Sequence, residues 1–228
     1  MGLKIEQFGL CGAGKTTFLE CFAPMLESYP LLNISKPIIP SQKRLIICFV
    51  KILLSGFLTR PMIFTRFLLK KESWWLVKKI AYRYACSANQ INNNLLLEDS
   101  GILQPFLSFE IEENLSNIIV PIDCLLKYCQ LPDIVLNFNI SPAIAMTRYE
   151  RRGVRGEGQT IRKNSEVYFH RASELQKKLI SYCKQKEVYI IDVDSQHEFT
   201  NRYIKTKFNE INALLRNKKR EKKYETVI

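Results

Sequence analysis

The sequence predicts an α/β fold in which helices cover both faces of a parallel sheet. Five short apolar runs, each typical of a buried strand, are separated by segments with helical periodicity: Leu3–Phe8, Leu31–Ser35, Asn94–Glu98, Ile134–Ile140 and Val188–Val193. Strands that alternate with helices form parallel sheets, and such sheets are buried on both faces. At 228 residues the chain is long enough for one domain with its own core. The predicted architecture is therefore three layers, with a five-stranded sheet between helices.

A glycine-rich segment follows the first apolar run directly. It reads Gly9-Leu-Cys-Gly-Ala-Gly-Lys-Thr16 and fits the pattern G-x-x-x-x-G-K-[ST] between a strand and a helix. The glycines let the backbone wrap around an anion, and the N–H groups at the helix start bind its phosphates. Lys15 is expected at the β- and γ-phosphates of ATP, and the Thr16 hydroxyl on Mg²⁺. The expected nucleotide-binding residues are Gly9, Gly12, Ala13, Gly14, Lys15, Thr16 and Thr17.

Two adjacent acids, Glu98 and Asp99, end the third apolar run. Next to a phosphate loop, an acid at a strand end can hold Mg²⁺ or accept a proton from the attacking group. Neighbouring residues of a strand point to opposite faces, so only one of these acids can face the phosphates. Asp99 is the expected metal ligand or general base and Glu98 the second choice. Capping of the following helix is the alternative role for such an acid.

Four arginines lie around a helix end and a glycine-rich loop: Arg148, Arg151, Arg152 and Arg155. Arg148 and Arg152 are four residues apart and share one helix face, whereas Arg155 lies among glycines. A mobile segment with several guanidinium groups can close over a triphosphate and stabilise charge on the transferred phosphoryl group. We therefore expect a lid at about residues 148–164, with Arg148, Arg152 and Arg155 in catalysis. A charged solvent-exposed face is the alternative.

More than fifty residues separate the second and third apolar runs, and most of them follow a helical pattern. We expect a helical insertion at about residues 40–90, in which Pro61 starts a new helix after a turn at Ser55 and Gly56. Residues 217–228 are rich in charge and are expected to form a frayed or disordered basic tail. Residues 1–216 are expected to form a single domain, because no internal repeat or low-complexity linker divides them.

The net charge of +12 is concentrated in and around this insertion. From Lys36 to Arg83 there are eleven basic residues and one acid, Glu72, which favours an anionic partner. The aromatic residues of the same stretch are Phe49, Phe57, Phe64, Phe67, Trp74 and Trp75. Together with the charge they predict peripheral contact with an anionic membrane, unless they only pack inside a helical subdomain. The apolar stretch from Arg44 to Leu58 is too short to span a bilayer.

The cysteines bear on zinc binding and on the redox compartment. Seven are scattered along the chain without a C-x-x-C pair, which argues against a zinc site. An odd number and the lack of a secretory signal ahead of Lys4 favour reduced thiols in the cytoplasm.

In this order, the loop, the strand-end acid and the arginine segment resemble the thymidylate-kinase-like nucleoside and nucleotide kinases. Gly9–Thr17, Pro132–Gly153 and the helix containing Tyr168 carry the resemblance. It implies a three-layer α/β/α fold with five parallel strands in the order 2-3-1-4-5, with ATP and Mg²⁺ as cofactors. Family members that phosphorylate thymidylate carry an arginine after the third strand, and Glu98-Asp99-Ser100-Gly101 has none.

The sequence therefore predicts an ATP- and Mg²⁺-dependent phosphotransferase that acts on a small acceptor, either anionic or lipid-linked. The alternatives are a thymidylate or other nucleoside monophosphate kinase proper, and a non-catalytic regulatory module that binds nucleotide. A GTPase switch is disfavoured, because no Asn-Lys-x-Asp element occurs. No specific nucleic acid partner is expected, and a homodimer is left open.

Overall fold

The computed structural model describes residues 3–27, 39–87, 95–98, 101–112, 121–151 and 165–225. Its strands are β1 (Leu3–Gly9), β2 (Leu95–Glu98), β3 (Ile134–Asn139) and β4 (Tyr189–Asp194). Its helices are α1 (Lys15–Glu27), α2 (Gln42–Thr59), α3 (Pro61–Leu68), α4 (Lys71–Ser87), α5 (Gln104–Glu112), α6 (Ile122–Leu126), α7 (Pro142–Arg151), α8 (Ser165–Gln185) and α9 (Asn201–Glu225).

The described strands form one parallel sheet in the order β2-β1-β3-β4. These are four of the five predicted strands, and their order agrees with the expected 3-1-4-5 part of the sheet. The remaining predicted strand, Leu31–Ser35, lies outside the described residues, so the described sheet has four strands rather than five. The structure thus confirms the predicted parallel sheet for these four strands.

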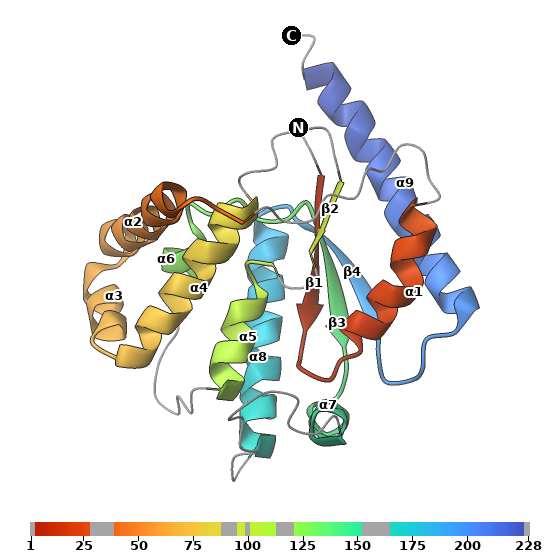
Figure 1. Ribbon diagram of the computed structural model, residues 1–228, viewed down its shortest axis with the longest axis horizontal. Helices are drawn as coiled ribbons and strands as arrows, with labels where there is room; N and C mark the ends of the chain where they lie inside the picture. The colour runs from red at the N-terminus through yellow and green to blue at the C-terminus, as the bar shows by residue number, and fades with distance from the viewer. Residues whose placement is uncertain are drawn as a thin grey trace.

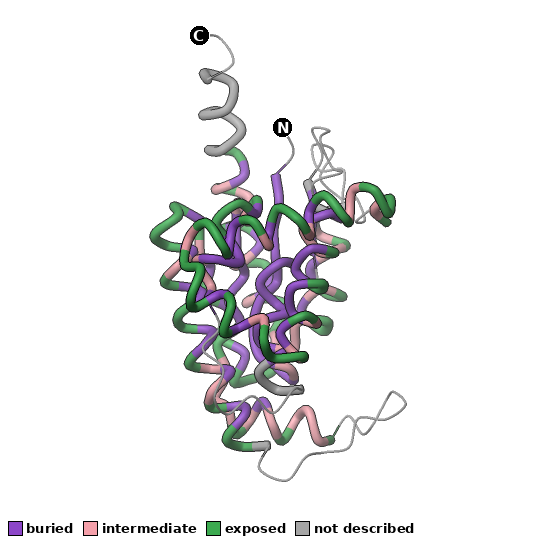
Figure 2. The backbone as a smooth tube through the Cα atoms, turned by 90° about the vertical axis from the view of Figure 1, so that its left-hand side faces the viewer, coloured by how far each residue is buried: buried purple, intermediate pink, exposed green. Residues whose placement is uncertain are grey.

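Helices cover both faces of the sheet (Figure 1). α1 and α9 lie on one face, where Ile5 of β1 and Phe138 of β3 join Phe18 and Phe208 in a buried cluster. α5 and α8 lie on the other face, and α2, α3, α4 and α6 extend this layer outward. α7 lies beyond the carboxyl end of β3, next to α8. Figure 2 shows the buried strands behind helices whose outer sides are exposed.

The helical insertion consists of α2, α3 and α4. Pro61 occupies the first turn of α3, where its missing N–H costs no hydrogen bond. The turn expected at Ser55 and Gly56 was wrong, because both residues are buried inside α2. A Cβ on Gly56 would lie 2.3 Å from the Phe64 ring, so this glycine allows α3 to pack closely on α2. The Ser55 hydroxyl donates a hydrogen bond to the Cys124 carbonyl at 2.6 Å.

The aromatic residues of the insertion pack mainly within the protein. Phe64 and Phe67 are buried, and the half-buried Trp75 ring stacks on Phe109 of α5 with 6.0 Å between centroids. The Trp74 indole N–H donates to the Leu68 carbonyl at 3.0 Å. The packing alternative therefore accounts for most of these rings. Among the described helices, none combines the length and apolar character that a membrane span requires.

α9 continues to Glu225 and so includes most of the predicted tail. The sequence predicted a frayed or disordered segment after residue 216, and the structure describes residues 217–225 as helix. This stretch contains no glycine or proline, and its lysine, arginine and glutamate residues have high helix propensity.

Candidate active site

The phosphate loop joins β1 to α1 at the carboxyl end of the sheet. Gly12 and Gly14 have φ angles of +85° and +76°, a region that residues with a Cβ rarely adopt. A Cβ on Gly12 would lie 2.3 Å from the Ala145 carbonyl oxygen of α7. The backbone conformation therefore favours glycine at both positions, and the close approach of α7 is a second reason for it at Gly12.

Lys15 bends back over this loop from the first turn of α1. Its Nζ donates hydrogen bonds to the carbonyl oxygens of Gly9 at 2.7 Å and Leu10 at 3.0 Å. The ammonium group is thereby fixed above the loop, next to the N-terminus of α1, where backbone N–H groups attract anions. Thr16 and Thr17 follow it and are both exposed. The expected phosphate-binding residues are thus brought together at one helix start.

Of the two acids predicted at the end of the third apolar run, the structure describes only Glu98. Glu98 is buried in β2, and its Oε2 lies 3.0 Å from Nζ of Lys4, which is buried as well. In the sheet, Glu98 lies beside Glu6, three residues before the loop begins at Gly9. Asp99 lies outside the described residues, so its role as metal ligand or base stays a prediction.

Glu6 is the most strongly perturbed acid among the described residues. It is fully buried, and burial raises its pKa to about 7, with Lys4 opposing and Glu98 adding to the shift. Its two carboxylate oxygens accept hydrogen bonds from the backbone N–H groups of Ile102 at 3.1 Å and Leu103 at 2.7 Å. Glu6 therefore anchors the segment that follows β2 and leads into α5.

Arg148 binds the loop after β4. Its guanidinium donates to the carbonyl oxygens of Ser195 at 2.7 Å and Gln196 at 3.0 Å. Arg151 is exposed at the end of α7, while Arg152 and Arg155 lie outside the described residues, as does most of the predicted lid. The described structure thus places Arg148 as a clamp between α7 and the β4–α9 loop.

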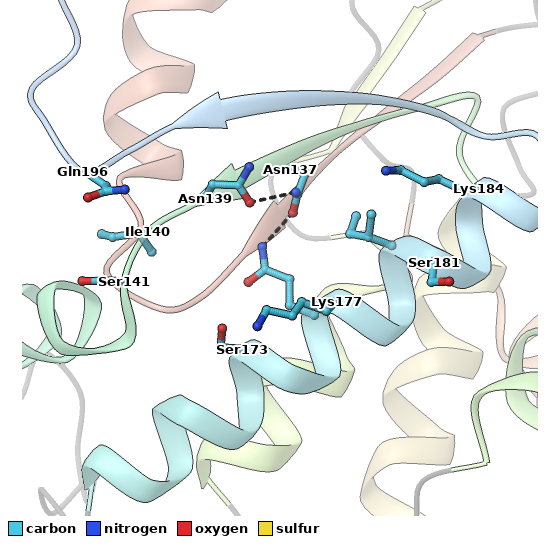
Figure 3. Close-up of a pocket in the computed structure, with 11 residues that line it drawn as sticks. Asn137, Asn139, Ile140, Ser141, Ser173, Lys177, Ser181, Lys184 and Gln196 are labelled. Atoms are coloured by element: carbon cyan, nitrogen blue, oxygen red, sulfur yellow. Dashed lines mark hydrogen bonds between the residues drawn. The ribbon is translucent and has the colours of Figure 1, made fainter.

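A polar pocket of about 570 Å³ opens beside the carboxyl ends of the strands, between β3 and α8 (Figure 3). Asn137 donates to Asn139 at 2.9 Å and to Asp192 at 2.7 Å, and Gln176 of α8 donates to Asn137 at 2.7 Å. Ser173, Lys177, Ser181 and Lys184 line the α8 side. Because the amide groups bond to one another and to Asp192, this network ties α8 to β3 and β4.

Comparison with solved structures identifies the fold. The structure of deoxyadenosine kinase from M. mycoides with bound dATP superposes with a TM-score of 0.57 and 16% identity. The same kinase with bound dCTP gives 0.53 and 16%, and its complex with the products dCMP and a flexible dCDP gives 0.56 and 17%. Each alignment covers 92% of this chain and 100% of the other.

The chain shares the fold of this deoxyadenosine kinase. No protein-family model matches the sequence, and neither does any curated protein. At 16–17% sequence identity the similarity concerns the fold. The similarity extends over almost the whole of both chains.

The sequence analysis did not predict three polar features of this fold: the buried acid Glu6, the buried cation Lys4 and the amide network around Asn137. A local signal for each was present, because polar residues interrupt otherwise apolar strands. A buried strand tolerates such residues only where a hydrogen-bond or ionic partner faces them. Their partners come from distant segments, such as Ile102 and Asp192, and no spacing rule identifies those pairs.

Proposed function

We propose that this chain is an ATP- and Mg²⁺-dependent phosphotransferase that transfers the γ-phosphate to a small anionic or lipid-linked acceptor. The observation that carries the proposal is the position of Lys15. Its Nζ is held by the carbonyls of Gly9 and Leu10 inside a loop with two left-handed glycines, at the start of a helix. A bound triphosphate would replace these carbonyls with its β- and γ-oxygens as partners of the ammonium group.

The chemistry requires little covalent participation by the protein. An acceptor oxygen attacks the γ-phosphorus in line, the bond from this phosphorus to the β–γ bridging oxygen breaks, and ADP leaves with that bonding pair. Lys15 and the loop N–H groups would neutralise charge that builds on the leaving phosphates. Mg²⁺, held by the Thr16 hydroxyl and the phosphates, would supply further neutralisation of this charge.

Asp99 would accept the acceptor's proton if that acceptor is a hydroxyl group. An acceptor phosphate, already ionised at neutral pH, would not need this base. Arg152 and Arg155 would close over the γ-phosphate from the lid, whereas Arg148 would hold the β4–α9 loop in place. The role of Asp99 thus depends on the class of acceptor.

A second candidate function is a deoxynucleoside or nucleoside monophosphate kinase. The specific observation in its favour is the fold similarity to deoxyadenosine kinase over 92% of this chain. The missing arginine after β2 weighs against a thymidylate acceptor, because that segment reads Glu98-Asp99-Ser100-Gly101.

Transfer of labelled γ-phosphate from ATP distinguishes these candidates. Purified protein is incubated with deoxynucleosides, nucleoside monophosphates, sugar phosphates and lipid extracts, with and without Mg²⁺. Lys15→Ala serves as the reference and should abolish transfer and weaken ATP binding sharply without unfolding the chain. Unchanged ATP affinity in folded Lys15→Ala would rule out the phosphate-loop assignment. ATP binding without transfer to any acceptor would favour the non-catalytic alternative.

A further inference from the structure

α2 is apolar on both of its sides. Its inner side is buried against the protein through Cys48, Ile52, Ser55 and Gly56. Its outer side exposes Ile46, Ile47, Val50, Leu54, Phe57 and Leu58, with 62% of Ile46 and 74% of Leu58 accessible. A helix that is apolar all round is normally buried on all sides, so the outer side of α2 requires a cover.

The exposed residues form one stripe that continues beyond α2. Ile46, Val50, Leu54 and Phe57 are three or four residues apart, which places them on the same side of the helix. Met62 and Ile63 of α3 and Leu69 after it are exposed as well, at 73%, 40% and 79%. We name these residues together with the α2 stripe the α2–α3 face. Figure 2 views the molecule from this side.

Every charged residue of the chain segment that carries this face is basic, and of these cations Arg60 pairs with Asp123 of α6 at 3.0 Å. From residue 39 to residue 71 the chain contains Lys43, Arg44, Lys51, Arg60, Arg66, Lys70 and Lys71, and no acid. Lys43 and Lys51 are exposed, and their helical positions lie within the α2 stripe and at its edge. An apolar stripe accompanied only by cations is the pattern of a helix that lies in the headgroup region of an anionic bilayer.

A second copy of the chain fits this face less well. A symmetric dimer would bring each cation of α2 toward the same cations of the partner, since its interface uses the same surface twice. No acid between residues 39 and 71 could compensate them. Anionic headgroups supply both the opposite charge and, directly beneath it, an apolar phase for the stripe.

We propose that the α2–α3 face docks on the surface of an anionic membrane, with α2 parallel to the bilayer plane. None of the described helices could span the bilayer, so the contact is peripheral. Docking depends on this face alone. The further consequence, that the acceptor is lipid-linked and approaches from the membrane, rests on the proposed phosphotransferase function.

Vesicle co-sedimentation tests docking directly. The full chain is mixed with vesicles of phosphatidylcholine alone and with vesicles that contain phosphatidylglycerol. We expect sedimentation with the anionic vesicles at low salt and partial release as ionic strength rises, because only the charge contribution is screened. Equal binding to neutral vesicles, or no binding to either, would overturn the proposal.

Two sets of variants locate the contact. The triple variant Ile47→Ser, Val50→Ser and Leu54→Ser removes apolar area, and the pair Lys43→Gln and Lys51→Gln removes charge. Each should reduce partitioning onto anionic vesicles at least tenfold, of the order expected for several apolar side chains or two cations at such a surface. Because the substituted residues are exposed, ATP affinity and the unfolding temperature should remain those of the wild type.

Matched control variants are made in α8, which lies outside the α2–α3 face. Val167→Ser replaces an equally exposed aliphatic residue of α8, and Lys177→Gln with Lys184→Gln removes two exposed cations of that helix. These variants should bind vesicles like the wild type, and an equal loss in the controls would contradict docking through α2. Sedimentation velocity of the same proteins without lipid tests whether the chain forms a dimer through the α2–α3 face. A wild-type dimer that the triple variant dissociates, with no vesicle binding, would assign the face to self-association instead.

The docking and function proposals fail separately. ATP binding and acceptor phosphorylation are measured in solution without vesicles. If the protein shows neither activity, the docking result still stands. Loss of docking in the triple variant with full activity on a soluble acceptor would disprove the lipid-linked acceptor and leave the kinase assignment standing.

Discussion

The backbone N–H of Leu103 donates a hydrogen bond of 2.7 Å to Oε1 of Glu6, and so joins the first strand to the start of α5. The neighbouring N–H of Ile102 binds the other carboxylate oxygen at 3.1 Å. Gly101 precedes them, and a Cβ there would lie 2.2 Å from the Glu6 carboxyl carbon. Glu6 therefore fixes the chain directly after the predicted catalytic acid, at a point where only glycine leaves it room.

Glu6 should make folding stability depend on pH between about 4.5 and about 7. Burial raises its pKa from 4.5 to about 7, so the folded chain holds this proton more tightly than the unfolded chain. The contribution of Glu6 to stability therefore falls as pH rises through this interval. In Glu6→Gln that dependence should be lost, so wild type should lose stability relative to the variant as pH rises.

Urea unfolding at several pH values measures this difference. Glu20→Gln, which changes an exposed acid of α1, is the control and should keep the wild-type profile. Parallel profiles for wild type and Glu6→Gln would show that Glu6 does not titrate in this range.

Arg148→Ala should weaken the β4–α9 loop rather than the chemical step. The guanidinium binds the carbonyls of Ser195 and Gln196, and loss of these hydrogen bonds should cost about 1–3 kcal/mol of stability. We expect a lower unfolding temperature and a raised KM for ATP with a smaller change in kcat. Arg151→Ala removes an exposed arginine of the same helix and should change neither. A fall in kcat alone would make Arg148 a transition-state residue, as the sequence suggested.

Cysteine reactivity should follow burial. None of the seven cysteines forms a disulfide, and burial raises the pKa of Cys129 and of Cys183 to about 12. The reactive thiolate is therefore scarce at both positions, whereas Cys21 is exposed. Mass spectrometry after brief maleimide treatment at pH 7 should find Cys21 modified and Cys129 and Cys183 intact until urea is added. Rapid labelling of Cys183 in the native protein would show that the α8 core opens.

Apolar runs and the glycine pattern predicted the sheet and the phosphate loop, because both signals are local. β1, β3 and β4 begin and end within one residue of the predicted runs, and Gly12 and Gly14 have the backbone conformation that such a loop requires. Gly56 shows where local signals fail. Glycine is favoured both in turns and where two helices approach closely, and only the position of Phe64 distinguishes these uses.

The roles of Glu98 and Arg148 depend on partners that are distant in the sequence, and sequence patterns do not identify such partners. Glu98 was considered as a catalytic acid because it ends an apolar run, but the register of β2 against β1 places it near Lys4. Arg148 was expected over the triphosphate, yet Ser195 lies 47 residues away in sequence and binds it. In both cases the type of residue was informative, and its partner depended on the tertiary fold.

The comparison of Glu98 with Asp99 is the sharpest test of the candidate site. Glu98 and Lys4 form a buried ion pair, so Glu98→Gln breaks that pair and should destabilise the fold by about 3–5 kcal/mol. The double variant Lys4→Met with Glu98→Leu removes both charges and should recover most of that loss.

Asp99→Asn, by contrast, should lower kcat at least 10²-fold, in the range of a lost general base, with little effect on stability. Unfolding midpoints and kcat are measured for all three proteins with the acceptor found in the transfer screen. If Asp99→Asn is mild while the double variant is stable but inactive, Glu98 is the functional acid and its pairing with Lys4 is part of the site.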